Sequence, residues 1–144
     1  MKLSKRFLND YVDVTDIPTR ELAEKMVFAG NEYESLEPIS TAKGLVVGEI
    51  ISCEKHPDSK KLSICKVNVG ESEPLQILCG APNVVMAHKV IVAKIGAVLP
   101  GGEIKKAKLA GMDSYGMICS LAELGLDAKY VTEADKEGIH ILPD

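Results

Sequence analysis

The stretch KLSICKVNVG, residues 61–70, decides the fold class because apolar and polar side chains alternate along it. The alternating positions are Cys65, Lys66, Val67, Asn68 and Val69. A period of two residues predicts a β-strand with one face in a core and the other face in solvent.

Similar strand-like stretches lie on either side of residues 61–70. They are LVVGEIISCEK (45–55), PLQILCG (74–80), KVIVAKIGAVL (89–99) and the buried strand end MICS (117–120). Loops rich in Pro, Gly, Asp and Asn separate them, and APNVVMAHK (81–89) is expected to form one short helix. Short strands at this spacing predict a small, closed, five-stranded β-barrel.

Residues 1–40 have a helical pattern instead. Ser4 is placed to cap a short helix, and a second helix is expected to begin near Pro18 or Thr19 and to end at Gly30. The chain is therefore mostly β, and α+β overall. We expect a helical segment over 1–40, a barrel over 41–129 and an acidic final segment over 130–144.

Composition limits the class of protein. The 144 residues are 46% hydrophobic and 26% charged, which suits one globular domain with an appendage. No apolar run approaches the ~20 residues of a membrane span, and no signal peptide is apparent. The four cysteines form no CxxC pair, which indicates reduced thiols and a soluble, cytoplasmic protein. A zinc site at Cys53, His56 and a distant cysteine is a poorly supported alternative.

Charge is unevenly distributed along the chain. Residues 41–108 hold ten Lys/Arg and six Asp/Glu, a net charge of +4, whereas residues 1–40 carry −3 and residues 109–144 carry −5. Nine lysines of the middle segment fall on predicted strands or beside them: Lys55, Lys60, Lys61, Lys66, Lys89, Lys94, Lys105, Lys106 and Lys108. A solvated surface would explain them, but a basic barrel also suits nucleic-acid binding.

Missing residue types narrow the kind of nucleic acid. No aromatic residue occurs between Tyr33 and Tyr115, and no arginine follows Arg20. Single-strand binders stack bases on aromatic rings, and arginine is the usual reader of base edges. The pattern therefore predicts salt-sensitive recognition of a folded RNA by its backbone and shape.

The stretch LAGMDSYGMICSLAELGL, residues 109–126, raises the question of catalysis. Ser114 lies between two glycines, but the string is one residue longer than the G-x-S-x-G turn of a nucleophilic serine. No histidine lies near Ser114 or Cys119 in the sequence to act as a base. We expect no catalytic residue, and a short helix over 120–126 capped by Ser120 with Glu123.

Several of these stretches resemble a known family. HPDSKKLSICKVNVG, ILCGAPNV, VAKIGAVLPGGEIKKAKLAG and SYGMICSLAELGL resemble the tRNA-binding domain of the EMAP-II-like OB-fold family. MKLSKRFLNDYVDV and LAEKMVFAGNEYES resemble the N-terminus of the family of bacterial phenylalanyl-tRNA synthetase beta subunits. The resemblance runs through the whole chain and implies that it is a fragment of a longer subunit.

The resemblance implies a parent enzyme that joins phenylalanine to its tRNA with ATP and magnesium. That enzyme is a cytoplasmic α2β2 heterotetramer, so the implied partners are tRNA, the rest of the beta subunit and the alpha subunit. Its aminoacylation, editing and anticodon-binding parts lie outside these residues, which implies no catalysis, cofactor or metal here, and no membrane or DNA partner. The family inserts the barrel into a helical domain, so residues 139–144 should return to the first domain.

The resemblance also implies binding residues on the basic strand face and around the S-x-G-M turn. With the neighbouring lysines, the candidate tRNA-binding residues are Lys55, Lys60, Lys61, Lys66, Asn83, Lys94, Lys105, Lys106, Lys108 and Ser114. Ala110-Gly111 stands where the family often has Arg-Gly, so one phosphate contact is missing and an auxiliary role is expected. A structural or protein-docking module and a free-standing dimeric chaperone are the alternatives.

Overall fold

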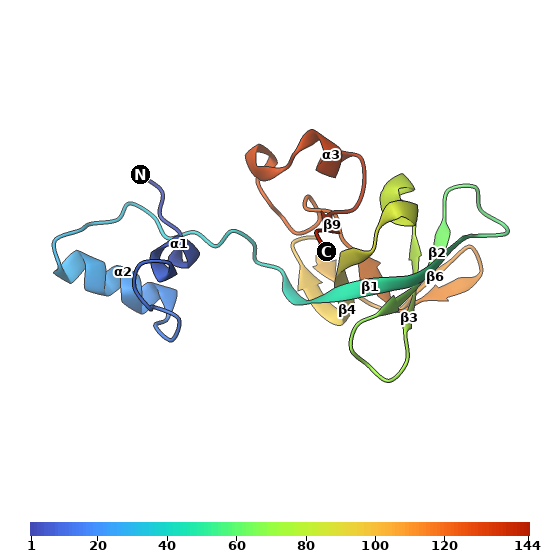
Figure 1. Cartoon of the computed structure of the whole chain (residues 1–144), viewed down its shortest axis with the longest axis horizontal. Helices are drawn as coiled ribbons and strands as arrows, with labels where there is room; N and C mark the ends of the chain where they lie inside the picture. The colour runs from blue at the N-terminus through green and yellow to red at the C-terminus, as the bar shows by residue number, and fades with distance from the viewer. The chain divides into compact units, whose positions relative to one another are not determined.

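The structure is a computed structural model that describes residues 1–144 and divides into two compact units, Met1–Pro38 and Ile39–Asp144. The first unit holds two helices, α1 (Lys5–Asn9) and α2 (Thr19–Phe28) (Figure 1). The Ser4 hydroxyl accepts a hydrogen bond from the Phe7 amide, as the sequence predicts for a capping serine. No helix in the structure is both long and apolar enough to cross a membrane.

The second unit is an antiparallel near-barrel. Its five principal strands are β1 (Lys43–Lys55), β2 (Ser63–Asn68), β3 (Leu75–Cys79), β4 (Lys89–Leu99) and β8 (Gly116–Ile118). The strand order is β3-β2-β1-β4, and β8 pairs with β4. A 3-10 helix, η1 (Pro82–Met86), connects β3 to β4. The predicted mostly β, five-stranded OB-like fold is confirmed.

Alternation on β2 explains the core. Ser63, Cys65 and Val67 are buried, and the intervening residues are more exposed. Cys65 and Val67 pack with Ile77 of β3 and with Val90 and Val92 of β4.

Gly48 allows β1 to cross this core closely. A Cβ atom there would lie 2.6 Å from Val67 Cγ1 and 2.7 Å from Val92 Cγ2, so a side chain would collide with both neighbouring strands. A bulge between Ile50 and Ser52 interrupts the pairing of β1 with β2. These irregularities bend β1 so that it pairs with both β2 and β4.

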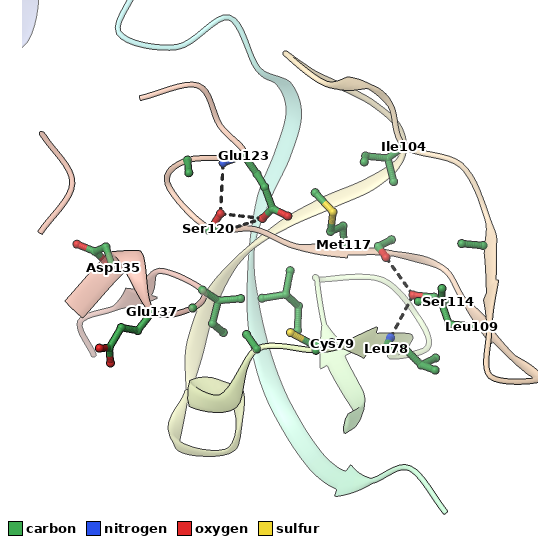
Figure 2. Close-up of a pocket in the computed structure, with 18 of the residues that line it drawn as sticks. Leu78, Cys79, Ile104, Leu109, Ser114, Met117, Ser120, Glu123, Asp135 and Glu137 are labelled. Atoms are coloured by element: carbon green, nitrogen blue, oxygen red, sulfur yellow. Dashed lines mark hydrogen bonds between the residues drawn. The ribbon is translucent and has the colours of Figure 1, made fainter. Parts of the chain in front are cut away.

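A few hydrogen bonds close the barrel between β3 and residues 114–116. The Tyr115 amide donates to the Gln76 carbonyl at 2.8 Å, and the Leu78 amide donates to Ser114 Oγ at 3.1 Å. The Ser114 hydroxyl in turn donates to the Gly116 carbonyl at 3.1 Å (Figure 2). A serine side chain thus takes the place of a backbone acceptor in the seam of the barrel.

The connection from β4 to β8 contains strands that the sequence did not predict. They are β5 (Gly102–Glu103), β6 (Ala107–Leu109) and β7 (Met112–Ser114). β6 and β7 form a hairpin whose turn residues, Ala110 and Gly111, have φ of 46° and 82°. The Ala110-Gly111 sequence noted above is therefore a tight hairpin turn.

The helix predicted over residues 120–126 was wrong, because this segment is a run of turns. Its capping box does form: the Ser120 amide donates to Glu123 Oε2 at 2.7 Å, and the Glu123 amide donates to Ser120 Oγ at 3.2 Å. Gly125 has a φ of 76°, which is the left-handed conformation that ends a helical turn. The capping signal is real, but the turn stops before a helix develops.

The final segment contains η2 (Ala128–Tyr130), α3 (Glu133–Lys136) and β9 (Ile141–Leu142). β9 pairs with β4, with Leu142 opposite Lys89. The segment belongs to the same compact unit as the barrel. The boundaries at residues 40 and 129, and the return of residues 139–144 to a helical domain, stay predictions.

Candidate nucleic-acid interface

The loop between β1 and β2 presents three lysines to solvent. Lys55 ends β1, and Lys60 and Lys61 follow in the loop. His56, which is only 4% exposed, shapes the loop because its Nδ1 accepts a hydrogen bond from the Asp58 amide at 3.0 Å. The loop therefore has an ordered base beneath an exposed, cationic tip.

A chain of hydrogen bonds joins β2, β3 and the β6–β7 hairpin. Lys66 Nζ donates to Gln76 Oε1 at 3.1 Å, and Gln76 Nε2 donates to the Asp113 carbonyl at 2.9 Å. Lys106 Nζ lies 3.0 Å from Asp113 Oδ2. Gln76 thereby brings lysines that are forty positions apart in the sequence to one surface.

Charge within this network is stable at neutral pH. The hydrogen bond from Lys106 lowers the pKa of the Asp113 carboxyl, and the same contact raises the pKa of Lys106. Lys108 lies opposite Asp113 in the hairpin, and Lys105 and Lys108 are exposed. The Asp113 carboxylate thus has two lysines beside it, Lys106 and Lys108, which leaves the hairpin cationic.

We call these residues the lysine surface: Lys55, Lys60, Lys61, Lys66, Lys106 and Lys108. The β1–β2 loop and the β6–β7 hairpin extend toward the same end of the barrel (Figure 1). A groove of about 740 Å³ lies beside Lys66, and Gln76 and Tyr115 line it together with the carboxylates of Glu71, Glu73 and Asp113. Glu71 and Asp113 are paired with Lys94 and Lys106. Lys105, also a candidate, lines a different hollow.

Three candidate residues have other roles in the structure. Asn83 binds the backbone of Ile139 with both ends of its amide: Nδ2 donates to the carbonyl at 2.8 Å, and Oδ1 accepts from the amide at 3.0 Å. Ser114 is 3% exposed and closes the barrel, so its hydroxyl is used within the fold. Lys94 is paired with the Glu71 carboxylate. Their contacts with tRNA stay predictions, and no free polar group of Asn83 or Ser114 supports them.

A second hollow, of about 720 Å³, lies between the barrel and residues 131–139 (Figure 2). Its wall is largely apolar and includes Leu78, Ile104 and Met117. Carboxylates of the lining residues are Glu103, Glu123, Asp135 and Glu137, against only Lys105 and Lys136. This acidic hollow and the groove beside Lys66 both have more carboxylates than lysines in their walls, so the candidate groups for phosphate are the exposed lysines of the β1–β2 loop and the hairpin.

The geometry contains no nucleophile paired with a base. Ser114 is bonded to backbone groups only, and burial raises the pKa of the Cys119 thiol to about 11. His88 and His140 bond to Asp144 and Asp135 at 2.7 Å and 2.6 Å. No group of three or more His, Cys, Asp or Glu side chains is arranged to hold a metal ion, and Cys53 Sγ lies instead 3.5 Å from Cys65 Sγ.

Sequence reasoning missed Gln76 and Asp113, which organise the lysine surface. Gln76 is a polar residue within an apolar strand, and that position is the signal that could have found it. Asp113 lies in the hairpin that had no strand-like pattern. Its acidic charge gave no reason to place it among lysines.

An antiparallel OB-like barrel with cationic groups on the β1–β2 loop, on β2 and on the β4–β8 connection defines a class of protein, the nucleic-acid-binding β-barrels. Residues 45–140 match the family described as "Putative tRNA binding domain". The chain belongs to this family of tRNA-binding domains.

Relatives extend the likeness beyond the barrel. Phenylalanine–tRNA ligase beta subunits of Bacillus cereus, Geobacillus kaustophilus and Listeria monocytogenes serotype 4b are each 50% identical over 145 residues. Each match covers 99% of this chain, and the chain spans 18% of the length of each relative. The C-terminal domain of Plasmodium vivax p43 is 27% identical, with a TM-score of 0.44, over 58% of this chain and 48% of that one.

Proposed function

We propose that this chain is an auxiliary tRNA-binding domain of a phenylalanyl-tRNA synthetase beta subunit. The family match over residues 45–140 and the 50% identity to beta subunits support the assignment. In this role the chain holds tRNA by phosphate and shape contacts and carries out no chemistry itself.

The observation that carries the proposal is the lysine surface. Lys60 and Lys61 are exposed at the tip of a loop whose base is ordered by His56. Ammonium groups of this kind neutralise phosphates and release condensed counterions, which makes binding strong at low salt and weak at high salt. Their contacts position the RNA without reading its sequence.

The wider assignment follows from the same relatives. We infer that the parent acts in the cytoplasm as an α2β2 enzyme, with the rest of the beta subunit and the alpha subunit as partners. We further infer that ATP and magnesium serve its other parts, because this chain spans only 18% of the length of the beta subunits it matches.

The test is a titration of tRNA at two salt concentrations with the parent and Lys60→Glu/Lys61→Glu. We expect the double variant to bind at least ~10-fold more weakly at low salt, and to reduce the slope of log K against log salt by about two. Lys2→Glu/Arg6→Glu makes the same change of charge on exposed residues of the other unit and should bind as the parent does. Equal binding by all three proteins would refute the surface.

A docking module is the second candidate function. Lys66, Lys94 and Lys106 already have partners within the chain, in Gln76, Glu71 and Asp113. A surface that only docks against protein would show no affinity for tRNA even at low salt, and that result would favour this candidate.

A further inference from the structure

Tyr115 lies close to Lys106 and lines a groove with Lys66, although it was not among the candidate residues. It is the first aromatic residue after Tyr33, and it lines the groove together with Lys66, Gln76 and Asp113. Its side chain is 37% exposed, so the ring is not a core residue. The unit that holds the barrel also exposes Tyr130, at 53%, but Tyr130 does not line this groove.

The backbone on both sides of Tyr115 is fixed. Its amide donates to the Gln76 carbonyl at 2.8 Å, and Ser114 next to it is bonded to Leu78. Gly116 follows with a φ of 151°, and a Cβ there would lie 2.8 Å from the Ala93 carbonyl oxygen. The ring is consequently held on a rigid strand end, which reduces the entropy lost when a ligand binds it.

Cationic groups lie beside the ring. Lys106 Nζ lies over one face of the Tyr115 ring, 5.0 Å from its centroid, and also pairs with Asp113, so a stacked base would use the opposite face. Lys66 lines the same groove, as do Glu71 and Glu73, and Lys94 pairs with Glu71. An aromatic plane with ammonium groups nearby matches a nucleotide, which presents a flat base and a phosphate a few ångströms away.

We propose that Tyr115 is a stacking platform for one unpaired base of the tRNA, with Lys66 and Lys106 on the flanking phosphates. This inference rests on the proposed function and deepens it. A base inside a duplex is covered by its neighbours, so the platform selects a loop or a single-stranded end of the tRNA. The rest of the lysine surface holds the folded RNA without regard to pairing.

The experiment compares the parent, Tyr115→Leu and Tyr115→Phe in binding to three probes. They are whole tRNA, a four-nucleotide single-stranded RNA and a blunt RNA duplex. We expect Tyr115→Leu to lose about 10-fold in affinity for tRNA and for the single strand, with no change for the duplex. Tyr115→Phe keeps the ring and should bind all three as the parent does.

Tyrosine emission gives an independent readout because the chain has no tryptophan and only four tyrosines. A base stacked on Tyr115 should quench part of the parent's emission, and this quenching should be absent in Tyr115→Phe although binding persists. That measurement keeps the test valid if Tyr115→Leu fails to fold.

Two outcomes separate this inference from the function on which it rests. If Tyr115→Leu binds tRNA and the single strand as the parent does, while Lys60→Glu/Lys61→Glu is impaired, stacking is wrong and the lysine surface stands. If the parent itself binds no tRNA at low salt, the proposed function fails and the platform fails with it.

Discussion

The lysine surface and the acidic hollow share one short segment of chain but differ in charge. Ser114 and Gly116 line the hollow, whereas Tyr115 between them lines the groove of the lysine surface. Successive side chains of an extended segment point to opposite sides, so neighbours serve different surfaces. The difference in charge comes mostly from added elements, the β1–β2 loop and the hairpin on one side and residues 131–139 on the other.

Gly116→Ala should disturb both surfaces at once and cause the largest loss of stability. The new methyl group would lie 2.8 Å from the Ala93 carbonyl oxygen, in a backbone conformation that alanine rarely adopts. We expect a loss of about 3 kcal/mol in the free energy of unfolding, measured with urea.

Gly70→Ala is the matched control for that substitution. Gly70 also has a positive φ, of 82°, but nothing lies within 4 Å of its added Cβ. It should cost about 1 kcal/mol from backbone strain alone. Similar losses for the two variants would show that the segment shared by the surfaces is not tightly packed.

Asn83→Ala should loosen the hollow and leave the lysine surface unchanged. It removes the two hydrogen bonds that hold Ile139, and we expect a loss of about 2 kcal/mol. Hydrogen exchange at the Ile139 amide should accelerate while tRNA affinity stays at the parent's value. Asn68→Ala, which removes one turn contact to the Gly70 amide, should have a smaller effect. A fall in tRNA affinity would mean that the two surfaces are coupled.

The smallest effect on stability is expected at His88, whose ring bonds to Asp144 at the end of the final segment. A hydrogen bond to Asp144, assisted by Glu49, raises the pKa of His88 in the folded chain. Because the pKa of His88 is higher in the folded chain than in the unfolded chain, its protonation stabilises the fold. This stabilisation is complete below pH about 6.5, the unfolded pKa, and is lost as pH rises through the folded pKa.

An NMR titration of His88 checks this prediction. In Asp144→Asn the pKa of His88 should fall toward its ordinary value, and the stability difference from the parent should shrink as pH rises above about 6.5. The signal of His140, which bonds to Asp135 instead, serves as an internal control. An unchanged His88 titration would show that Asp144 does not hold the end of the segment.

The main strands could be predicted from the sequence because each buries alternate or continuous apolar residues. The hairpin of β6 and β7 could not, since each strand has only three residues, β6 is exposed, and pairing alone defines them. Residues 120–126 show the opposite error, because a helix was predicted there and does not form. Their capping box is present, but Gly125 ends the turn before a helix forms.

The site was predictable in its charge and not in its geometry. Exposed lysines such as Lys60 could be identified, because lysine is rarely buried. Asn83 and Ser114 are also polar, yet each uses its side chain within the fold to satisfy backbone groups of residues far along the chain. Only the packing of segments far apart in the sequence shows which polar side chains bond within the fold and which face solvent.

Closure of the barrel by Ser114 has a consequence for how the chain reaches its native state. Leu78 and Ser114 are 36 positions apart, so their contact closes a long loop and carries an entropic cost that the β2–β3 hairpin avoids. The hairpin can therefore form early, and the seam forms late. Lys66 and Lys106 are linked across that seam through Gln76 and Asp113, so a partly folded chain has every lysine of the surface and does not yet have the surface itself.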